Sequence, residues 1–273
     1  MAVKTKRYEK HKIDAKPLQF NYKWLRRLAP LLTLALIIAS WQYVFTAKIY
    51  PEFIIPGPFQ VWDAFLESIA DGTLYRHSTV TLTEMLLGLA YGLTIGAFLG
   101  YLIARIQILE DLLSPIIVAF QATPVVAYAP LLIIWFRDGI TGKVITTAVI
   151  VFFPTLMNVI VGVRNVPRDL RDLMRVVKAS PLQVFLKLEV PSAMPIFLTG
   201  LKTSVTLAVI GAVVGEFVNA NAGLGYLVIS ARSQYNTPLV FVAVFTMTAL
   251  ALLLFSSISL LEWYLLKWQR RSR

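Results

Sequence analysis

The chain contains no cysteine and only two histidines among its 273 residues. Without cysteine there is no disulfide and no thiolate nucleophile, and His11 and His77 are too far apart to form a metal cluster. A phosphate-binding loop is also missing, because Val144 follows Gly142-Lys143 where such a loop requires Ser or Thr. We therefore expect no catalytic residues, no metal, no cofactor and no ATPase site of the chain's own.

Charged residues are scarce as well. They make up 15% of the chain, against 57% hydrophobic residues, and the mean hydropathy is +0.68. About 20 apolar helical residues cross a hydrocarbon core. Such runs predict an all-α integral membrane protein with a transmembrane domain over 28–266, basic tails at 1–27 and 267–273, and six spans at about 28–46, 80–103, 112–136, 144–163, 193–218 and 238–266.

The basic residues fall mostly on one side of this topology. Twenty of the 26 lysines and arginines lie in the two tails, the loop after the second span and the segment 164–191, and five lie on the opposite side. The positive-inside rule then makes both termini and segment 164–191 cytoplasmic. Orientation and anionic lipid headgroups explain the net charge of +11 without a nucleic-acid partner. Lys202, inside the fifth span, is expected to extend to the cytoplasmic headgroups.

Two patterns stand out inside the spans. Glycines recur every four residues in the second span and predict a ridge for close helix packing: Gly88, Gly92, Gly96 and Gly100. Prolines predict breaks in the third and fourth spans, at Pro115, Pro124, Pro130 and Pro154. Polar residues at membrane depth either line a translocation path or form hydrogen bonds with neighbouring helices, and the sequence favours neither role. These residues are Gln121, Thr123, Asn158, Glu216 and Asn219. Outside the membrane, an amphipathic helix is predicted over 59–70.

Segment 164–191 contains the start and stop signals of two short helices. Asn165 and Pro167 predict the start of the first, which runs to about residue 177. Ser180 and Gln183 form a capping box for the second, which is expected to end near Pro191. A structured polar segment between apolar spans predicts a surface for a soluble partner.

This segment also resembles the EAA loop of bacterial ABC importer permeases. Asp172-Leu-Met, Lys178 and Leu188-Glu-Val-Pro191 match the spacing of Glu-Ala-Ala, Gly and Ile-x-Leu-Pro, with Pro191 identical and Lys178 in place of glycine. The stretches QATPVVAYAPLLIIWF (121–136) and LAVIGAVVGEFVNANAGLGYL (207–227) are similar to the nitrate, sulfonate and taurine permease family, nearest its thiamine-pyrimidine precursor and riboflavin branch.

The resemblance implies a type I ABC importer permease fold in a bacterial inner membrane. It implies a second permease subunit forming a homodimer, separate cytoplasmic ABC ATPase subunits, and an extracytoplasmic substrate-binding protein. The cargo would be a vitamin or vitamin precursor, or else a sulfonate- or nitrate-type anion. Coupling to the ATPase would fall to Arg171, Asp172, Leu173, Lys178, Ser180, Leu188 and Pro191. The alternative is a secondary transporter driven by an ion gradient, with Glu84 or Glu216 carrying protons.

Overall fold

The computed structural model describes residues 23–136 and 139–267, and every regular element within them is a helix. Met1–Ile49 forms one unit and Tyr50–Arg273 another. The first unit contains α1 (Lys23–Thr46), which is long and apolar enough over Leu28–Thr46 to cross a membrane. The predicted basic tails, 1–27 and 267–273, lie outside the described residues except at their inner ends.

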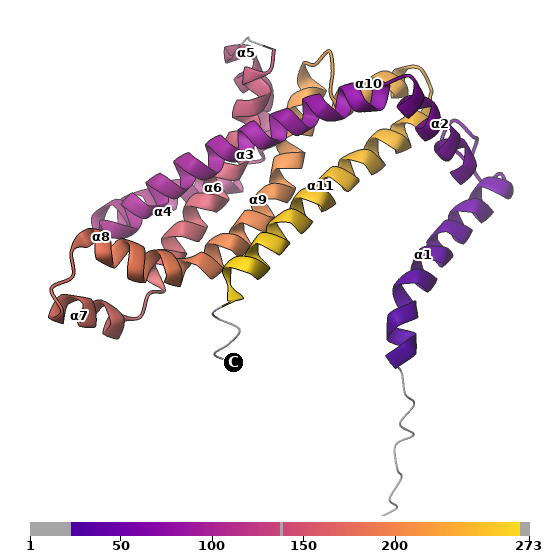
Figure 1. Cartoon of the computed structure of the whole chain (residues 1–273). Helices are drawn as coiled ribbons and strands as arrows, with labels where there is room; N and C mark the ends of the chain where they lie inside the picture. Colours follow the sequence, from indigo (N-terminus) through magenta and orange to yellow (C-terminus); the bar gives the residue numbers. More distant parts are fainter. Residues whose placement is uncertain (1–22, 137–138, 268–273) are drawn as a thin grey trace, which may run out of the picture. The chain divides into compact units, whose positions relative to one another are not determined.

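Four long helices form the frame of the second unit: α3 (Thr73–Arg105), α6 (Thr141–Arg164), α9 (Val190–Val218) and α11 (Thr237–Leu265) (Figure 1). Between α3 and α6 in sequence come α4 (Gln107–Ala122) and α5 (Val125–Trp135). The short elements are α2 (Pro58–Ala70), α7 (Arg168–Val176), α8 (Pro181–Val184), the π-helical turn η1 (Phe185–Glu189) and α10 (Leu224–Ser233).

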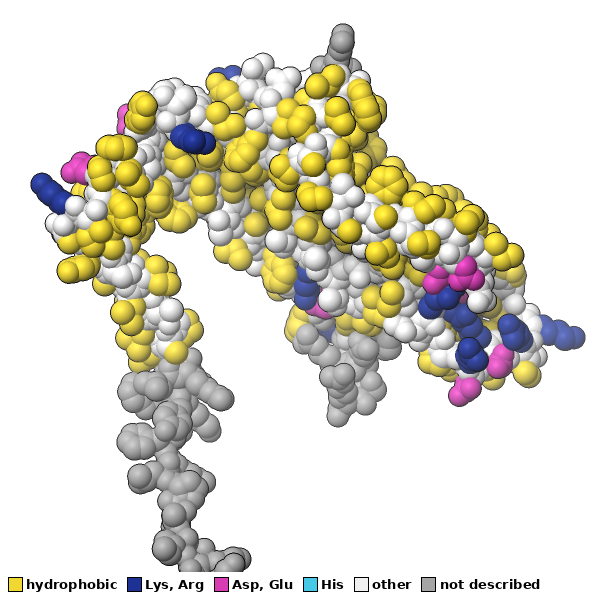
Figure 2. Space-filling view, turned by 180° about the vertical axis from the view of Figure 1, so that it is seen from behind, with side chains coloured by type: hydrophobic (Ala, Val, Ile, Leu, Met, Phe, Trp, Pro, Cys, Tyr) yellow, Lys and Arg dark blue, Asp and Glu magenta, His cyan; other side chains and the backbone are white. Residues whose placement is uncertain are grey.

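The all-helical, multi-span architecture is confirmed. Five helical segments are individually long and apolar enough to cross a membrane, and the count becomes the predicted six when the bent pair of α4 and α5 is taken as one span. The amphipathic helix predicted over 59–70 is present as α2. Hydrophobic side chains cover much of the face of the second unit that Figure 2 shows, as a lipid-facing surface requires.

Only one of the four predicted proline breaks interrupts a helix. At Pro124 the chain turns by 98° between α4 and α5, because Thr123 is extended and proline disfavours helical backbone in the residue before it. Pro115, Pro130 and Pro154 lie within continuous helices, so the prediction of breaks there is wrong. Each removes one hydrogen bond, which neighbouring turns and helices compensate.

The core lies where α3, α6 and α9 pack together. One cluster joins Leu89 of α3, Val151 of α6, and Val205 and Ala208 of α9, all buried. Small residues permit this close approach. A Cβ atom built on Gly92 would lie 2.6 Å from the carbonyl oxygen of Ala148 on α6. The other ridge glycines, Gly88, Gly96 and Gly100, also face residues of α6.

Candidate functional site

The segment between α6 and α9 forms a compact projection at one end of the bundle (Figure 1). Helix α7 begins at Arg168 with Pro167 as its N-cap, and Asn165 instead caps the C-terminus of α6, which shifts the predicted start. The predicted capping box of the second helix is confirmed. The Ser180 amide donates to Gln183 Oε1 at 2.8 Å, and the Gln183 amide donates to Ser180 Oγ at 3.3 Å.

The corner between α7 and α8 depends on Lys178. Its backbone is left-handed, with φ of 50°, the conformation that glycine adopts without a Cβ penalty. The Lys178 amide donates to the Arg175 carbonyl at 3.0 Å, and the Ala179 amide donates to the Met174 carbonyl at 2.9 Å. These two bonds close the end of α7, so lysine adopts the conformation of the glycine whose place it takes.

The prediction that the second helix ends near Pro191 is wrong. Helix α8 continues through η1 into α9, and Pro191 lies in the first turn of α9. The physical reason is the wider π turn, in which the Val190 amide donates to the Phe185 carbonyl five residues earlier. Proline normally ends a helix because it lacks an N–H and crowds the carbonyl four residues back. A π turn relieves that crowding, so the helix continues past Pro191.

The outer surface of this projection combines apolar and charged side chains. No residue of α7 is buried; Leu173 is 56% exposed, and Leu182 on α8 is 65% exposed. Asp172 is exposed and forms an ion pair with Arg175 at 3.0 Å. Charged side chains gather at this end of the unit in Figure 2. Exposed apolar side chains beyond the membrane spans favour contact with another protein.

Two other predicted coupling residues, Arg171 and Leu188, face the bundle, whereas Lys178 and Ser180 are exposed. Arg171 donates from Nη2 to the carbonyl oxygen of Val163 near the end of α6, at 2.6 Å. Leu188 is buried. Arg164, the last residue of α6 and not one of the predicted coupling residues, forms an ion pair with Glu110 of α4. The predicted set therefore divides into an exposed surface and residues that attach this surface to the bundle.

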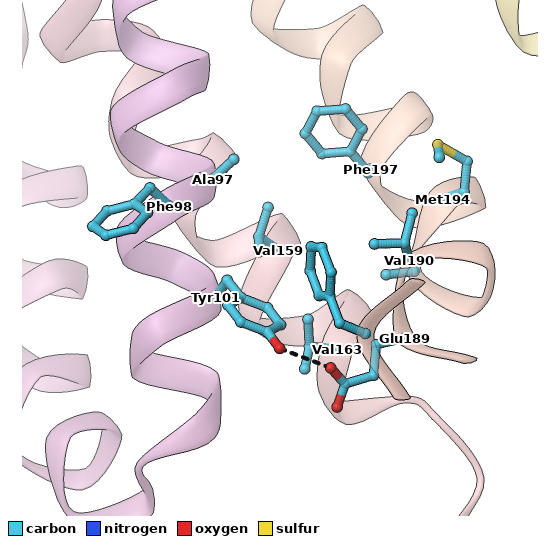
Figure 3. Close-up of a pocket in the computed structure, with 11 residues that line it drawn as sticks. Ala97, Phe98, Tyr101, Val159, Val163, Glu189, Val190, Met194 and Phe197 are labelled. Carbon is cyan, nitrogen blue, oxygen red and sulfur yellow. Dashed lines mark hydrogen bonds between the residues drawn. The ribbon is translucent and has the colours of Figure 1, made fainter. Parts of the chain in front are cut away.

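A second attachment, not predicted from the sequence, joins η1 to the end of α3. Glu189 is buried, at 2% exposure, and its Oε2 accepts a hydrogen bond from the Tyr101 hydroxyl at 2.9 Å (Figure 3). The same oxygen lies 3.0 Å from Arg105 Nη2, and Arg105 Nε donates to the Tyr101 hydroxyl at 2.9 Å. Beside this triad, an apolar pocket of about 330 Å³ lies between α3, α6 and α9, with Phe98 and Phe197 in its wall.

The opposite end of the bundle holds a buried polar network. Glu84 of α3 forms an ion pair with Lys143 of α6, with 2.5 Å between Oε1 and Nζ. Glu216 of α9 accepts hydrogen bonds from the Thr81 hydroxyl, at 2.6 Å, and from the Gly225 amide. These bonds join three helices to the start of α10.

The loop before α10 is held by the same network. The Gly223 amide donates to His77 Nδ1 at 3.0 Å, and the Leu224 amide donates to Thr81 Oγ1 at 2.7 Å. Sequence reasoning missed Thr81, His77 and Lys143. A signal was available, because residues 77, 81, 84 and 88 share one helical face with the glycine ridge.

The predicted path residues lie in separate places. Gln121 and Thr123 are exposed at the bend between α4 and α5, and Asn219 is exposed at the end of α9. Asn158 is half-buried, with its side chain against Gly200. Glu216 belongs to the buried network. The structure does not gather these five into one site, and their role in a path stays a prediction.

Two further features concern Lys202 and the metal-binding residue types. Lys202 forms an ion pair with Glu262 of α11, and its expected extension to the cytoplasmic headgroups stays a prediction. Within residues 23–136 and 139–267, no group of three or more His, Asp or Glu residues could hold a metal ion.

Apolar spans around a glycine-lined seam, with a structured polar projection between two of them, define a multi-pass membrane transport component. The chain belongs to the family described as "Binding-protein-dependent transport system inner membrane component", whose profile matches residues 92–268. It is thus a permease subunit of a binding-protein-dependent ABC importer, located in the inner membrane and working with ATPase and substrate-binding subunits. The predicted family and transport class are confirmed, and the ion-gradient alternative is not favoured.

Relatives of known type match along most of the chain. The riboflavin transport system permease protein RibX of Chloroflexus aurantiacus is 41% identical over 237 residues, covering 87% of this chain and 88% of its own. The formylaminopyrimidine transport permease protein ThiX of Halalkalibacterium halodurans is 34% identical, covering 89% and 97%. The putative aliphatic sulfonates transport permease protein SsuC of Bacillus subtilis is 31% identical, covering 94% and 92%.

Solved structures support the same fold. A chain of the MetNI methionine ABC transporter in an inward-facing conformation superimposes with a TM-score of 0.64 and 19% identity, covering 72% of this chain and 97% of that one. The fold of an ABC importer permease, predicted from the sequence, is confirmed.

Proposed function

We propose that two copies of this chain form the path of an importer for riboflavin or a related vitamin precursor such as a thiamine pyrimidine. A sulfonate- or nitrate-type anion is the second candidate. The 41% identity to the riboflavin permease RibX, higher than the 31% to the sulfonate permease SsuC, supports this order. Residues 28–266 would form the membrane domain, with both termini cytoplasmic and the ATPase site on separate subunits.

In this proposal, segment 164–191 docks onto the ATPase. The observation that carries it is the exposed surface of α7 and α8, where Leu173 and Leu182 project beyond a corner closed by Lys178. Asp172, Ser180, Leu188, Pro191 and Arg171 would set the shape and attachment of that surface. Motion of the ATPase pair would then displace α7 and α8.

Copurification tests the docking surface. The full chain, tagged and extracted in mild detergent with its partner subunits, should retain the ATPase. Leu173→Arg places an unpaired charge in the proposed contact and should release the ATPase while leaving the permease folded. Tyr235→Arg is the matched control, because Tyr235 is also well exposed but lies between α10 and α11. Full retention of the ATPase by Leu173→Arg would overturn the docking proposal.

Orientation and cargo need separate assays. Because the chain has no cysteine, single cysteines can be introduced at Val176 and Tyr235 without background labelling. An impermeant maleimide added to intact spheroplasts should label position 235 and spare position 176.

For cargo, cells expressing the complete importer should accumulate labelled riboflavin, and unlabelled thiamine pyrimidine or taurine should be compared as competitors. Uptake blocked by taurine alone would favour the anion.

A further inference from the structure

The carboxylate of Glu189 lies at the junction between the coupling projection and the membrane bundle. It comes from the last residue of the π turn, and its partners, Tyr101 and Arg105, come from the final turns of α3. The three side chains contact one another in all pairwise combinations, since Arg105 also donates to the Tyr101 hydroxyl. In Figure 3 the Tyr101 hydroxyl points directly at the Glu189 carboxylate across the edge of the pocket.

Burial makes this contact specific. Glu189 is 2% exposed, and a desolvated carboxylate is tolerated only with charged or hydrogen-bonding partners in good geometry. Arg105 remains 40% exposed and supplies both a charge and a planar donor group. Separation of η1 from α3 would therefore leave a buried charge unpaired, so the two elements are held at one spacing.

The π turn explains why this carboxylate faces α3. A π turn inserts one residue into a helix, and each inserted residue rotates the N-terminal part of the helix by about 100° relative to the C-terminal part. Pro191, which cannot donate to a carbonyl four residues back, fits directly after this wide turn. The insertion thus allows the coupling projection and α9 to share one continuous helix while Glu189 points across to α3.

We propose that Glu189 is a positioning residue that ties the coupling projection to the inner end of α3, so that displacement of α7 and α8 moves α3. This inference rests on the proposed docking of α7 and α8 onto the ATPase. The opposite attachment, from Arg171 to Val163, ties the same projection to α6. Since α6 packs against the glycine ridge of α3, the two attachments fix the projection to a single helix pair.

The test is coupling efficiency in the complete importer reconstituted in proteoliposomes. Glu189→Gln keeps the shape and an acceptor for Tyr101 but removes the charge that faces Arg105. We expect ATP hydrolysis to stay within about twofold while uptake per ATP falls about tenfold, a typical coupling free energy between sites. Glu67→Gln is the matched control, because Glu67 is exposed on α2, outside segment 164–191, and the same change there should leave uptake per ATP unchanged.

A double-mutant cycle separates positioning from a merely structural role. Arg105→Gln, at the partly exposed partner, should lower uptake per ATP as Glu189→Gln does, and the double variant should be no worse than either single one. Unchanged uptake per ATP in both single variants, or additive losses, would overturn the inference. If Glu189→Gln fails to fold, Arg105→Gln tests the same contact from its partly exposed side.

The same assay distinguishes this inference from the docking proposal. If Leu173→Arg releases the ATPase while Glu189→Gln keeps normal uptake per ATP, docking stands and only the role of Glu189 fails. If Leu173→Arg retains the ATPase and normal uptake, the docking proposal itself fails.

Discussion

Substituting methionine for Lys143 removes the positive charge that faces Glu84 inside the bundle. The two side chains are 7% and 0% exposed, and Lys143 Nζ lies 2.5 Å from Glu84 Oε1. Methionine keeps most of the stem of lysine, so the change isolates the charge. A carboxylate left buried without its partner stays desolvated and uncompensated, and we expect the free energy of unfolding to fall by about 3–5 kcal/mol.

Thermal unfolding of the purified chain in mild detergent, followed by tryptophan fluorescence, measures this loss. The double variant Glu84→Gln/Lys143→Met should recover most of it, because removing both charges leaves none unpaired. Lys202→Met is the matched control, since Lys202 and Glu262 are each 22% exposed and the remaining carboxylate can be hydrated. The reasoning is refuted if Lys143→Met unfolds like the unsubstituted chain, or if the double variant is as unstable as the single one.

Two glycine substitutions test close packing, one in α3 and one in the loop before α10. Gly92→Ala places a Cβ 2.6 Å from the Ala148 carbonyl oxygen and should lower unfolding stability by about 1–3 kcal/mol, whereas Gly139→Ala, with open space around it, should not. Gly223→Ala introduces a Cβ at a φ of 121° that overlaps the Glu216 carboxylate, and it should cost about 1–3 kcal/mol or more. Both losses are measured by the same thermal unfolding, and unchanged midpoints would contradict the close packing.

The sequence predicts the parts of this protein that depend on local patterns. Apolar run length locates the spans, and the capping box over 180–183 locates the start of the second short helix, because each depends only on neighbouring residues. The four-residue repeat of glycine likewise marks the face of α3 that carries the ridge. None of these features requires knowledge of which helices are neighbours.

The features that were missed depend on tertiary structure. The pairing of Glu84 with Lys143 joins residues from different helices, and no pattern within either helix identifies the other. The partner of Lys202 was missed for the same reason, since Glu262 lies 60 residues away. The π turn before Pro191 was missed because one inserted residue hardly changes the hydrophobic period of a short segment.

Helix α3 carries buried polar contacts in both of its halves. Its first half holds the network around Glu84, and its last turn holds Arg105 against the coupling projection. Arg105 follows Glu84 by 21 positions, which corresponds to about 32 Å of helix at a rise of about 1.5 Å per residue. Along this length the glycine ridge leaves no room for even a Cβ between α3 and α6. Close-packed helices slide or tilt together more readily than they separate. A displacement at Arg105 would therefore move α3 as a rigid unit. The loop before α10, which Glu216 and Thr81 hold against α3, would move with it.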